Sequence, residues 1–173
     1  MNFQILPERR DDAVLIEPLL DRTFGADRKQ RTVYRLREGL PPLPELAFVA
    51  VDDSATLLAS IRYWPIVIGD TPAVLLGPLA VEPRLQGQGI GKNLVRFSLD
   101  AARRLGHGVC VVVGEPTYYR PYGFTNASEA AIALPGPVDL ERFLVAPLKD
   151  GALEGVQGLI GRAGPAPLMA GNQ

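Results

Sequence analysis

The feature that most constrains this chain is a glycine-rich turn, Gln86-Gly87-Gln88-Gly89-Ile90-Gly91-Lys92, which lies between an apolar segment and an amphipathic one. Glycine adopts backbone conformations that other residues avoid, and it lets a ligand approach the main chain closely. The apolar residues from Ile90 to Leu105 recur at three- and four-residue spacing, which predicts a helix packed on a sheet. The first N–H groups of that helix would be unpaired and would face the turn at the positive end of the helix dipole. The turn therefore predicts a binding site for a phosphate group.

Spacing separates three glycine-rich phosphate motifs. A Walker A loop requires a glycine where this chain has Gln86, and a hydroxyl residue where it has Asn93. A dinucleotide-binding fingerprint requires a third glycine where this chain has Lys92, and it should follow the first strand of its domain. Both patterns fail, so a nucleotide-binding module is the weakest of the alternatives considered for this chain.

The third pattern, [QR]-x-x-G-x-[GA], is matched in full by Gln86, Gly89 and Gly91, directly after a strand-like run. This arrangement resembles the acetyl-CoA pyrophosphate loop of the GNAT superfamily of acyl-CoA-dependent N-acyltransferases. Further segments are similar to uncharacterised bacterial acetyltransferases of that superfamily: residues 77–83, 105–107 and 114–124. The resemblance covers about residues 2–150, and its specific part is 75–124.

The pattern of apolar residues predicts an α/β chain with a mixed sheet. We expect helices over residues 13–24, 29–38, 90–105 and 117–122, and strands over 2–7, 46–51, 56–68, 72–81, 109–113, 130–134 and 142–148. The three strands between 46 and 81 are separated by short polar turns, which predicts an antiparallel meander. The helix that follows the glycine turn would connect a parallel pair of strands. The resemblance implies the GNAT fold, whose central sheet is mostly antiparallel.

Composition bounds the remaining classes. We expect one domain over 1–150 and a Gly-, Pro- and Ala-rich extension over 151–173, of which the last ten residues form a loose tail. The net charge of −1 argues against nucleic acid or a membrane surface as a partner, and no apolar run is long enough to span a bilayer. Cys110 is the single cysteine, so we expect no internal disulfide, no metal site and a cytoplasmic location.

The resemblance implies acetyl-CoA as the co-substrate and assigns the residues that would hold it. Pantetheine would pair with the strand edge formed by Leu79, Ala80 and Val81. The main chain of Gly87, Gln88, Gly89, Ile90, Gly91 and Lys92 would bind the diphosphate, with Lys92 adding charge and Gln86 bracing the loop. Unpaired amides in a cleft cost about 1–3 kcal/mol each, so the two amides of pantetheine need such partners.

The resemblance also implies a general acid, Tyr119, in the pattern Y-x-x-x-G-F that ends at Gly123-Phe124. Its neighbour Tyr118 would point elsewhere, because adjacent helical residues do not share a face. A protonated phenol can donate to the thiolate that leaves. For the base we expect Glu115, at the end of the strand over 109–113, with Glu82 as the alternative; either residue could instead be a solvated surface carboxylate.

In this family a bulge before the loop exposes a backbone N–H for the oxyanion, and Gly77-Pro78 is consistent with such a break in strand pairing. The acceptor would lie against the first two helices. Candidates there are Arg28, Arg31, Tyr34, Arg35, Arg37, Tyr63 and Trp64. The arginines would favour an acceptor with a carboxylate or phosphate, unless they form a solvated helix face.

These expectations predict an N-acetyltransferase that transfers acetyl from acetyl-CoA directly to a primary amine of a small molecule or peptide. The alternative from another class is a non-catalytic acyl-CoA-binding sensor. The acceptor and the oligomeric state are left open, with a homodimer among the alternatives.

Overall fold

The structure, a computed structural model of the whole chain, describes residues 2–163. The predicted loose tail, residues 164–173, lies outside the described residues. A mixed sheet forms the centre of the molecule, with neighbouring strands in the order β1-β2-β3-β4-β5-β8-β6. Its strands are β1 (Gln4–Pro7), β2 (Phe48–Val51), β3 (Leu57–Ile68), β4 (Thr71–Val81), β5 (Val109–Val113), β6 (Thr125–Asn126) and β8 (Phe143–Pro147). The strands β2, β3 and β4 form the predicted antiparallel meander, which is confirmed.

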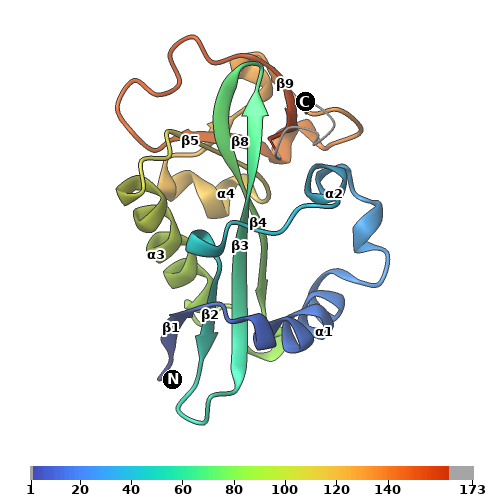
Figure 1. Cartoon of the computed structure of the whole chain (residues 1–173), viewed down its shortest axis with the longest axis vertical. Helices are drawn as coiled ribbons and strands as arrows, with labels where there is room; N and C mark the ends of the chain where they lie inside the picture. Colours follow the sequence, from blue (N-terminus) through green and yellow to red (C-terminus); the bar gives the residue numbers. More distant parts are fainter. Residues whose placement is uncertain (1, 164–173) are drawn as a thin grey trace, which may run out of the picture.

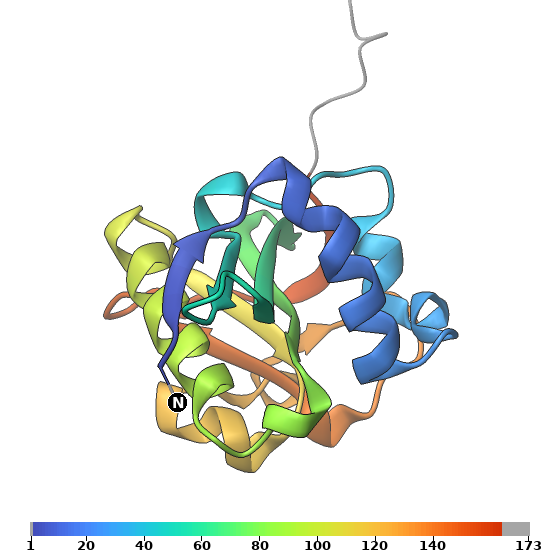
Figure 2. The ribbon, with the colours of Figure 1, turned by 90° about the horizontal axis from the view of Figure 1, so that it is seen from below.

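Helices cover both faces of the sheet. Figures 1 and 2 show α3 (Ile90–Arg104) on one face, and α1 (Ala13–Phe24) with α2 (Thr32–Arg37) on the other. The side of α3 that faces the sheet carries buried Leu94, Val95 and Leu99. The α1 helix buries Ile16, Leu19 and Leu20 against Val49 and Ala80. None of the described helices is long and apolar enough to cross a membrane.

The crossover from β4 through α3 to β5 produces a parallel pair, as predicted, but this pair is short. Registered partners are only Val74 with Cys110 and Leu75 with Val111. Beyond Leu75 the side of β4 that faces β5 has no partner among the described strands. Residues 76–81, the second half of β4, therefore have an unpaired edge before the glycine turn.

The pairing of β3 with β4 is also interrupted. Ile61 pairs with Leu79 and Tyr63 pairs with Leu76, so Gly77 and Pro78 together lie opposite the single residue 62. Two residues opposite one is the defining feature of a β-bulge. The break in regular pairing predicted at Gly77-Pro78 is confirmed.

Elsewhere several elements differ from the expected ranges. The segment expected as one helix over 29–38 is a 3-10 turn (Arg28–Gln30) followed by α2, because the backbone at Arg31 is extended. The short helix α4 (Pro116–Tyr119) continues as a 3-10 turn (Arg120–Tyr122). The strand expected over 130–134 is reduced to β7 (Ile132–Ala133).

The sheet continues beyond residue 150. Strand β9 (Gly158–Arg162) pairs antiparallel with β3 and parallel with β7. Ile160, in the middle of β9, is 1 % exposed. The segment expected as the start of a C-terminal extension thus contributes a strand to the fold, with one side chain, Ile160, buried.

Candidate functional site

The glycine turn presents unpaired main-chain donors. Gly87 and Gly89 have φ of 85° and 90°, a region that glycine enters without the steric cost of a Cβ. Gly89 precedes the first residue of α3, and no side chain caps the helix there. Within residues 2–163 the protein offers no hydrogen-bond acceptor to the N–H groups of residues 87–92. The turn thus combines free donors with the positive end of a 15-residue helix, an arrangement that can bind an anion.

Two side chains brace this turn. The Gln86 amide donates to the carbonyl of Val81 at 3.3 Å, which joins the turn to the end of β4. The Asn93 amide donates to the carbonyl of Gly89 at 2.8 Å. Lys92 is exposed, so its ammonium can reach a ligand only at the surface of the turn.

The unpaired edge of β4 continues directly into this turn. Leu79 and Val81 are half-buried beside it, and Ala80 is buried against α1. A linear ligand with amide groups could pair with this edge as an added strand while its anionic end lies at the turn. These positions correspond to the residues that the sequence assigns to pantetheine and the diphosphate.

The two adjacent tyrosines of α4 lie in different surroundings. The Tyr119 side chain is 7 % exposed and its ring packs against Phe124, with centroids 5.5 Å apart. A Cβ on Gly114 would overlap that ring, so glycine is required there for Tyr119 to occupy this position. Burial, with a smaller effect of neighbouring Tyr118, raises the pKa of Tyr119 above its ordinary value. The phenol therefore stays protonated at neutral pH.

Tyr118 is half-buried, and its hydroxyl points to the start of α3. A Cβ on Gly91 would lie only 2.7 Å from that hydroxyl and 3.3 Å from a methyl group of Val81. Burial raises the pKa of Tyr118 to about 12. The sequence analysis assigns Tyr118 no role, and only the fold reveals this contact, because Gly91 lies 27 positions earlier in the chain.

The two candidate bases, Glu115 and Glu82, differ in whether the carboxylate is already paired. Glu115 is exposed at the end of β5, where its main-chain carbonyl accepts from the N–H groups of Tyr118 and Tyr119. Glu82 forms a bidentate pair with Arg22 of α1, at 3.2 and 2.8 Å. Glu82 is thus already engaged in joining α1 to the end of β4. No group of three or more metal-ligating side chains occurs among the described residues.

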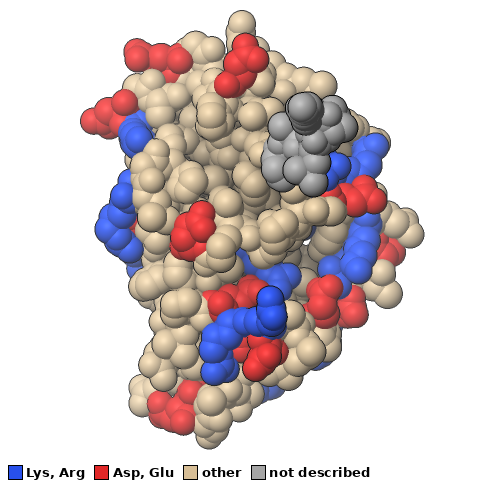
Figure 3. Space-filling view, in the orientation of Figure 1, with Lys and Arg blue, Asp and Glu red and all other residues tan. Residues whose placement is uncertain are grey.

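A cavity of about 580 Å³ lies on the α1 and α2 side of the sheet, next to the bulge in β4. Figure 3 shows basic and acidic side chains gathered around a hollow on this face. Its described lining residues are Glu17, Leu20, Arg28, Lys29, Tyr34, Arg35, Arg37, Glu38, Leu40, Arg62, Trp64 and Pro78. Their position beside the unpaired edge of β4 makes this cavity the candidate acceptor site.

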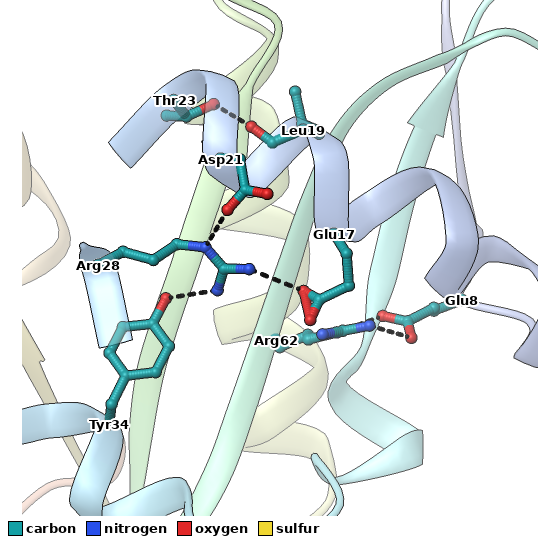
Figure 4. A network of polar contacts seen from close by, with 8 residues as sticks. All are labelled: Glu8, Glu17, Leu19, Asp21, Thr23, Arg28, Tyr34 and Arg62. Atoms are coloured by element: carbon teal, nitrogen blue, oxygen red, sulfur yellow. Dashed lines mark hydrogen bonds and ion pairs between the residues drawn. The ribbon is translucent and has the colours of Figure 1, made fainter. Parts of the chain in front are cut away.

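Arg28 holds the two sides of the cavity together. Its guanidinium, 4 % exposed, donates to Asp21 at 3.0 Å, to Glu17 at 3.2 Å and to the hydroxyl of Tyr34 at 3.2 Å. Figure 4 shows this group between α1, which carries both carboxylates, and Tyr34 of α2. Arg62 of β3 pairs with Glu8, both bonds being 2.9 Å.

Two of the expected acceptor residues lie elsewhere. Tyr63 is fully buried on the α3 side of the sheet, where its hydroxyl is 2.7 Å from that of Ser98. Successive strand residues point to opposite faces, so only Trp64 of this pair can line the cavity. Arg31 is exposed and lies over the ring of Phe24 at 5.6 Å, outside the cavity lining. Placing Tyr63 and Arg31 in the acceptor wall was wrong, whereas Arg28, Tyr34, Arg35, Arg37 and Trp64 do line it.

Two solved acetyltransferase structures have folds similar to that of this chain. An N-acetyltransferase, YhbS, from Escherichia coli in complex with CoA superposes with a TM-score of 0.78 at 30% identity, covering 94% of this chain and 90% of that one. An acetyltransferase of the GNAT family from Brucella melitensis in complex with acetyl-CoA has a TM-score of 0.67 at 26% identity, covering 92% and 95%.

Sequence comparison gives the same family. Uncharacterized N-acetyltransferase YhbS of Escherichia coli (strain K12) is 33% identical over 151 residues, which are 86% of this chain and 89% of the relative. The family profile described as Acetyltransferase (GNAT) family matches residues 14–124, a span that runs from α1 through the glycine turn to the end of the tyrosine motif. With the mixed sheet and the short parallel pair, these matches show that the chain belongs to the GNAT family of acetyltransferases.

Proposed function

We propose that this protein is an acetyl-CoA-dependent N-acetyltransferase that transfers acetyl directly to a primary amine. The observation that carries the proposal is the row of unpaired N–H groups over residues 87–92, continuous with the unpaired edge of β4. Both features need a ligand that carries phosphate at one end and amides along its length. Coenzyme A has both.

The relatives support this choice of co-substrate, since YhbS was solved with CoA and the Brucella protein with acetyl-CoA. In this chain, the diphosphate would accept from the main chain of Gly87, Gln88, Gly89, Ile90, Gly91 and Lys92. The pantetheine amides would pair with Leu79, Ala80 and Val81. The thioester would then lie between β4 and β5, near the bulge at Gly77-Pro78.

Tyr119 would be the general acid. The amine attacks the thioester carbonyl, a tetrahedral intermediate forms, and its collapse expels the thiolate of coenzyme A. Because burial raises the pKa of Tyr119, the phenol is protonated when the thiolate leaves and can donate its proton. The base that takes the proton of the amine would be Glu115, which is exposed and would act through water.

An acceptor screen that detects free coenzyme A tests the proposal. Wild type should release coenzyme A with at least one primary amine of the panel. Tyr119→Phe should lower kcat about 100-fold or more and leave the thermal shift with acetyl-CoA unchanged, because it removes only the donated proton. Tyr118→Phe is the matched control on the neighbouring residue, and its kcat should change far less.

One result would contradict the proposed function, and another would contradict only the role of Tyr119. Binding of acetyl-CoA without turnover of any amine would favour the alternative, a non-catalytic acyl-CoA sensor. Full activity of Tyr119→Phe would leave the transferase intact and remove the acid role from Tyr119. A cytoplasmic location and a homodimer stay predictions from the sequence.

A further inference from the structure

The cavity beside the bulge is lined by an excess of positive charge. Among its described lining residues five are Lys or Arg and two are Glu. Its volume of about 580 Å³ is in the range of small-molecule pockets. A cation that is already paired with a carboxylate of the protein attracts an anion only weakly, so the ion pairs of each lysine and arginine must be considered.

Arg28 and Arg62 are neutralised within the protein, the first by Glu17 and Asp21 and the second by Glu8. Arg37 differs from both. It is 8 % exposed, yet no carboxylate of the described residues lies within 4.0 Å of it, and its Nε has no hydrogen-bond partner in that part of the chain. A buried cation without an anion is unfavourable unless a ligand supplies the negative charge.

Two aromatic rings hold the Arg37 guanidinium in place. Its central carbon lies 4.7 Å from the ring centroid of Tyr34 and 5.7 Å from that of Trp64. Trp64 is itself fixed, because its indole N–H donates to the carbonyl of Gly77 at 2.6 Å. The guanidinium is therefore preorganised and tied to the bulge in β4. Burial lowers the pKa of Arg37 to about 10, and the side chain stays charged at neutral pH.

The distance from Arg37 to the bulge limits the acceptor. A Cβ on Gly77 would lie 3.0 Å from Nη2 of Arg37, and Pro78 lines the same cavity. An anion bound to Arg37 would thus lie beside the strand segment where the thioester is expected. The amine that reacts there must be only a few bonds from its own anionic group.

We propose that the acceptor is a small amine carrying an oxyanion, a carboxylate or a phosphate, within a few bonds of its nitrogen, and that Arg37 binds this oxyanion. The assignment rests on the proposed function and adds its substrate class. It excludes simple alkylamines and polyamines as good substrates, because each places a cation or an apolar group beside Arg37. A lysine side chain of a protein also lacks an anion near its nitrogen.

Matched pairs of amines test this assignment in the coenzyme A release assay. The pairs are alanine with alaninamide, and phosphoethanolamine with ethanolamine. One member of each pair carries the anion, and the two pairs together separate carboxylate from phosphate. Comparing each pair in wild type and variant removes the difference in basicity between the two amines. Wild type should prefer the anionic member of at least one pair by about 100-fold in kcat/KM, the effect typical of a buried charge pair. Arg37→Gln should abolish that preference, with kcat/KM for the anionic member falling about 100-fold, to the level of the neutral member.

Arg31→Gln is the control, because it removes one arginine of the same region outside the cavity. It should keep the wild-type preference. The thermal shift with acetyl-CoA should be the same in wild type and both variants, which shows that each is folded and binds its co-substrate.

The outcomes separate the two proposals. Equal rates of wild type with the anionic and neutral members of both pairs would overturn the anion assignment and leave the transferase intact. So would a preference that survives Arg37→Gln, or turnover of a lysine peptide at rates above those of both anionic amines. Failure of every amine, with acetyl-CoA still bound, would overturn the proposed function and the assignment together.

Discussion

The glycine turn follows the end of β4, and the cavity lined by Arg28, Arg35, Arg37 and Arg62 lies beside the bulge in the same strand. The two regions are built in opposite ways. At the turn, the donors are main-chain N–H groups of six consecutive residues, 87–92, and the contributing side chains mostly brace the backbone. In the cavity the donors are side chains from α2, β3 and the 3-10 turn before α2, and ion pairs hold two of them, Arg28 and Arg62. The first can bind one kind of ligand through a fixed backbone. The second can change its ligand with single substitutions, since its chemistry lies in side chains.

This difference suits two ligands with different requirements, the co-substrate and the acceptor of the proposed reaction. An acyl-CoA co-substrate is the same for many enzymes, so a backbone cradle suits it. An acceptor differs between enzymes, so it is selected by exchangeable side chains on a common strand. If the two regions are independent, a substitution in one of them should leave ligand binding at the other unchanged.

The largest effect is expected for Gly89→Glu. The substitution places a carboxylate in the anion site and forces a side chain onto a backbone with φ of 90°. Affinity for acetyl-CoA, measured by thermal shift or calorimetry, should fall at least about 100-fold through strain and like-charge repulsion. Gly123→Glu is the matched control, since Gly123 has φ of 95° and open space around it but lies outside the turn. Equal losses in the two variants would show that strain, not the anion site, is responsible.

Arg28→Gln should destabilise the side of the cavity formed by α1 and α2. It removes three hydrogen bonds of a buried guanidinium, so the free energy of unfolding in urea should fall by about 2 kcal/mol. Arg31→Gln, an exposed position, should change it by less than about 0.5 kcal/mol. The stabilisation of Arg28→Gln by acetyl-CoA should equal that of wild type. A lost response would mean that the turn and the cavity are not independent.

Trp64→Phe tests the connection between the two regions. The variant removes the indole N–H that donates to Gly77 at 2.6 Å and leaves that carbonyl without this partner. The free energy of unfolding should fall by about 1 kcal/mol, and kcat should fall more than the affinity for acetyl-CoA. An unchanged kcat would show that this bond does not position the bulge for the reaction.

The smallest effect is expected for Lys92→Ala. Lys92 is exposed, and an exposed charge near the ligand contributes about 1 kcal/mol or less. Affinity for acetyl-CoA should fall less than about tenfold. Added salt should weaken the binding of acetyl-CoA less in Lys92→Ala than in wild type. A loss as large as that of Gly89→Glu would assign the binding to side chains and refute the contrast drawn above.

The same contrast decides what could be predicted from the sequence. The turn, α3 and the meander follow from local spacing, so Gln86, Gly89 and Gly91 suffice to predict the anion site. The cavity is assembled from residues that the fold brings together, such as Arg28 and Trp64, and no spacing relates them. The prediction for Tyr63 was wrong because Tyr63 and Trp64 are consecutive in β3 and point to opposite faces, so only one of them can line the cavity. Which of the two does so depends on which face of the sheet α1 and α2 cover, and local spacing does not give this.

Strand β9 was missed for a related reason. Its sequence, Gly158-Leu159-Ile160-Gly161-Arg162, is short and glycine-rich, and its stability comes from pairing with β3 more than ninety residues earlier. Tyr118 was likewise assigned no role, because its contact with Gly91 depends on how α4 packs against α3. Such long-range contacts are invisible to local patterns.

The most direct test of the account is an experimental structure of this protein with acetyl-CoA. We predict that the diphosphate oxygens lie within hydrogen-bond distance of several N–H groups between residues 87 and 92, with the pantetheine amides paired to β4 after Leu76. A diphosphate bound elsewhere, with those N–H groups still facing solvent, would contradict the account.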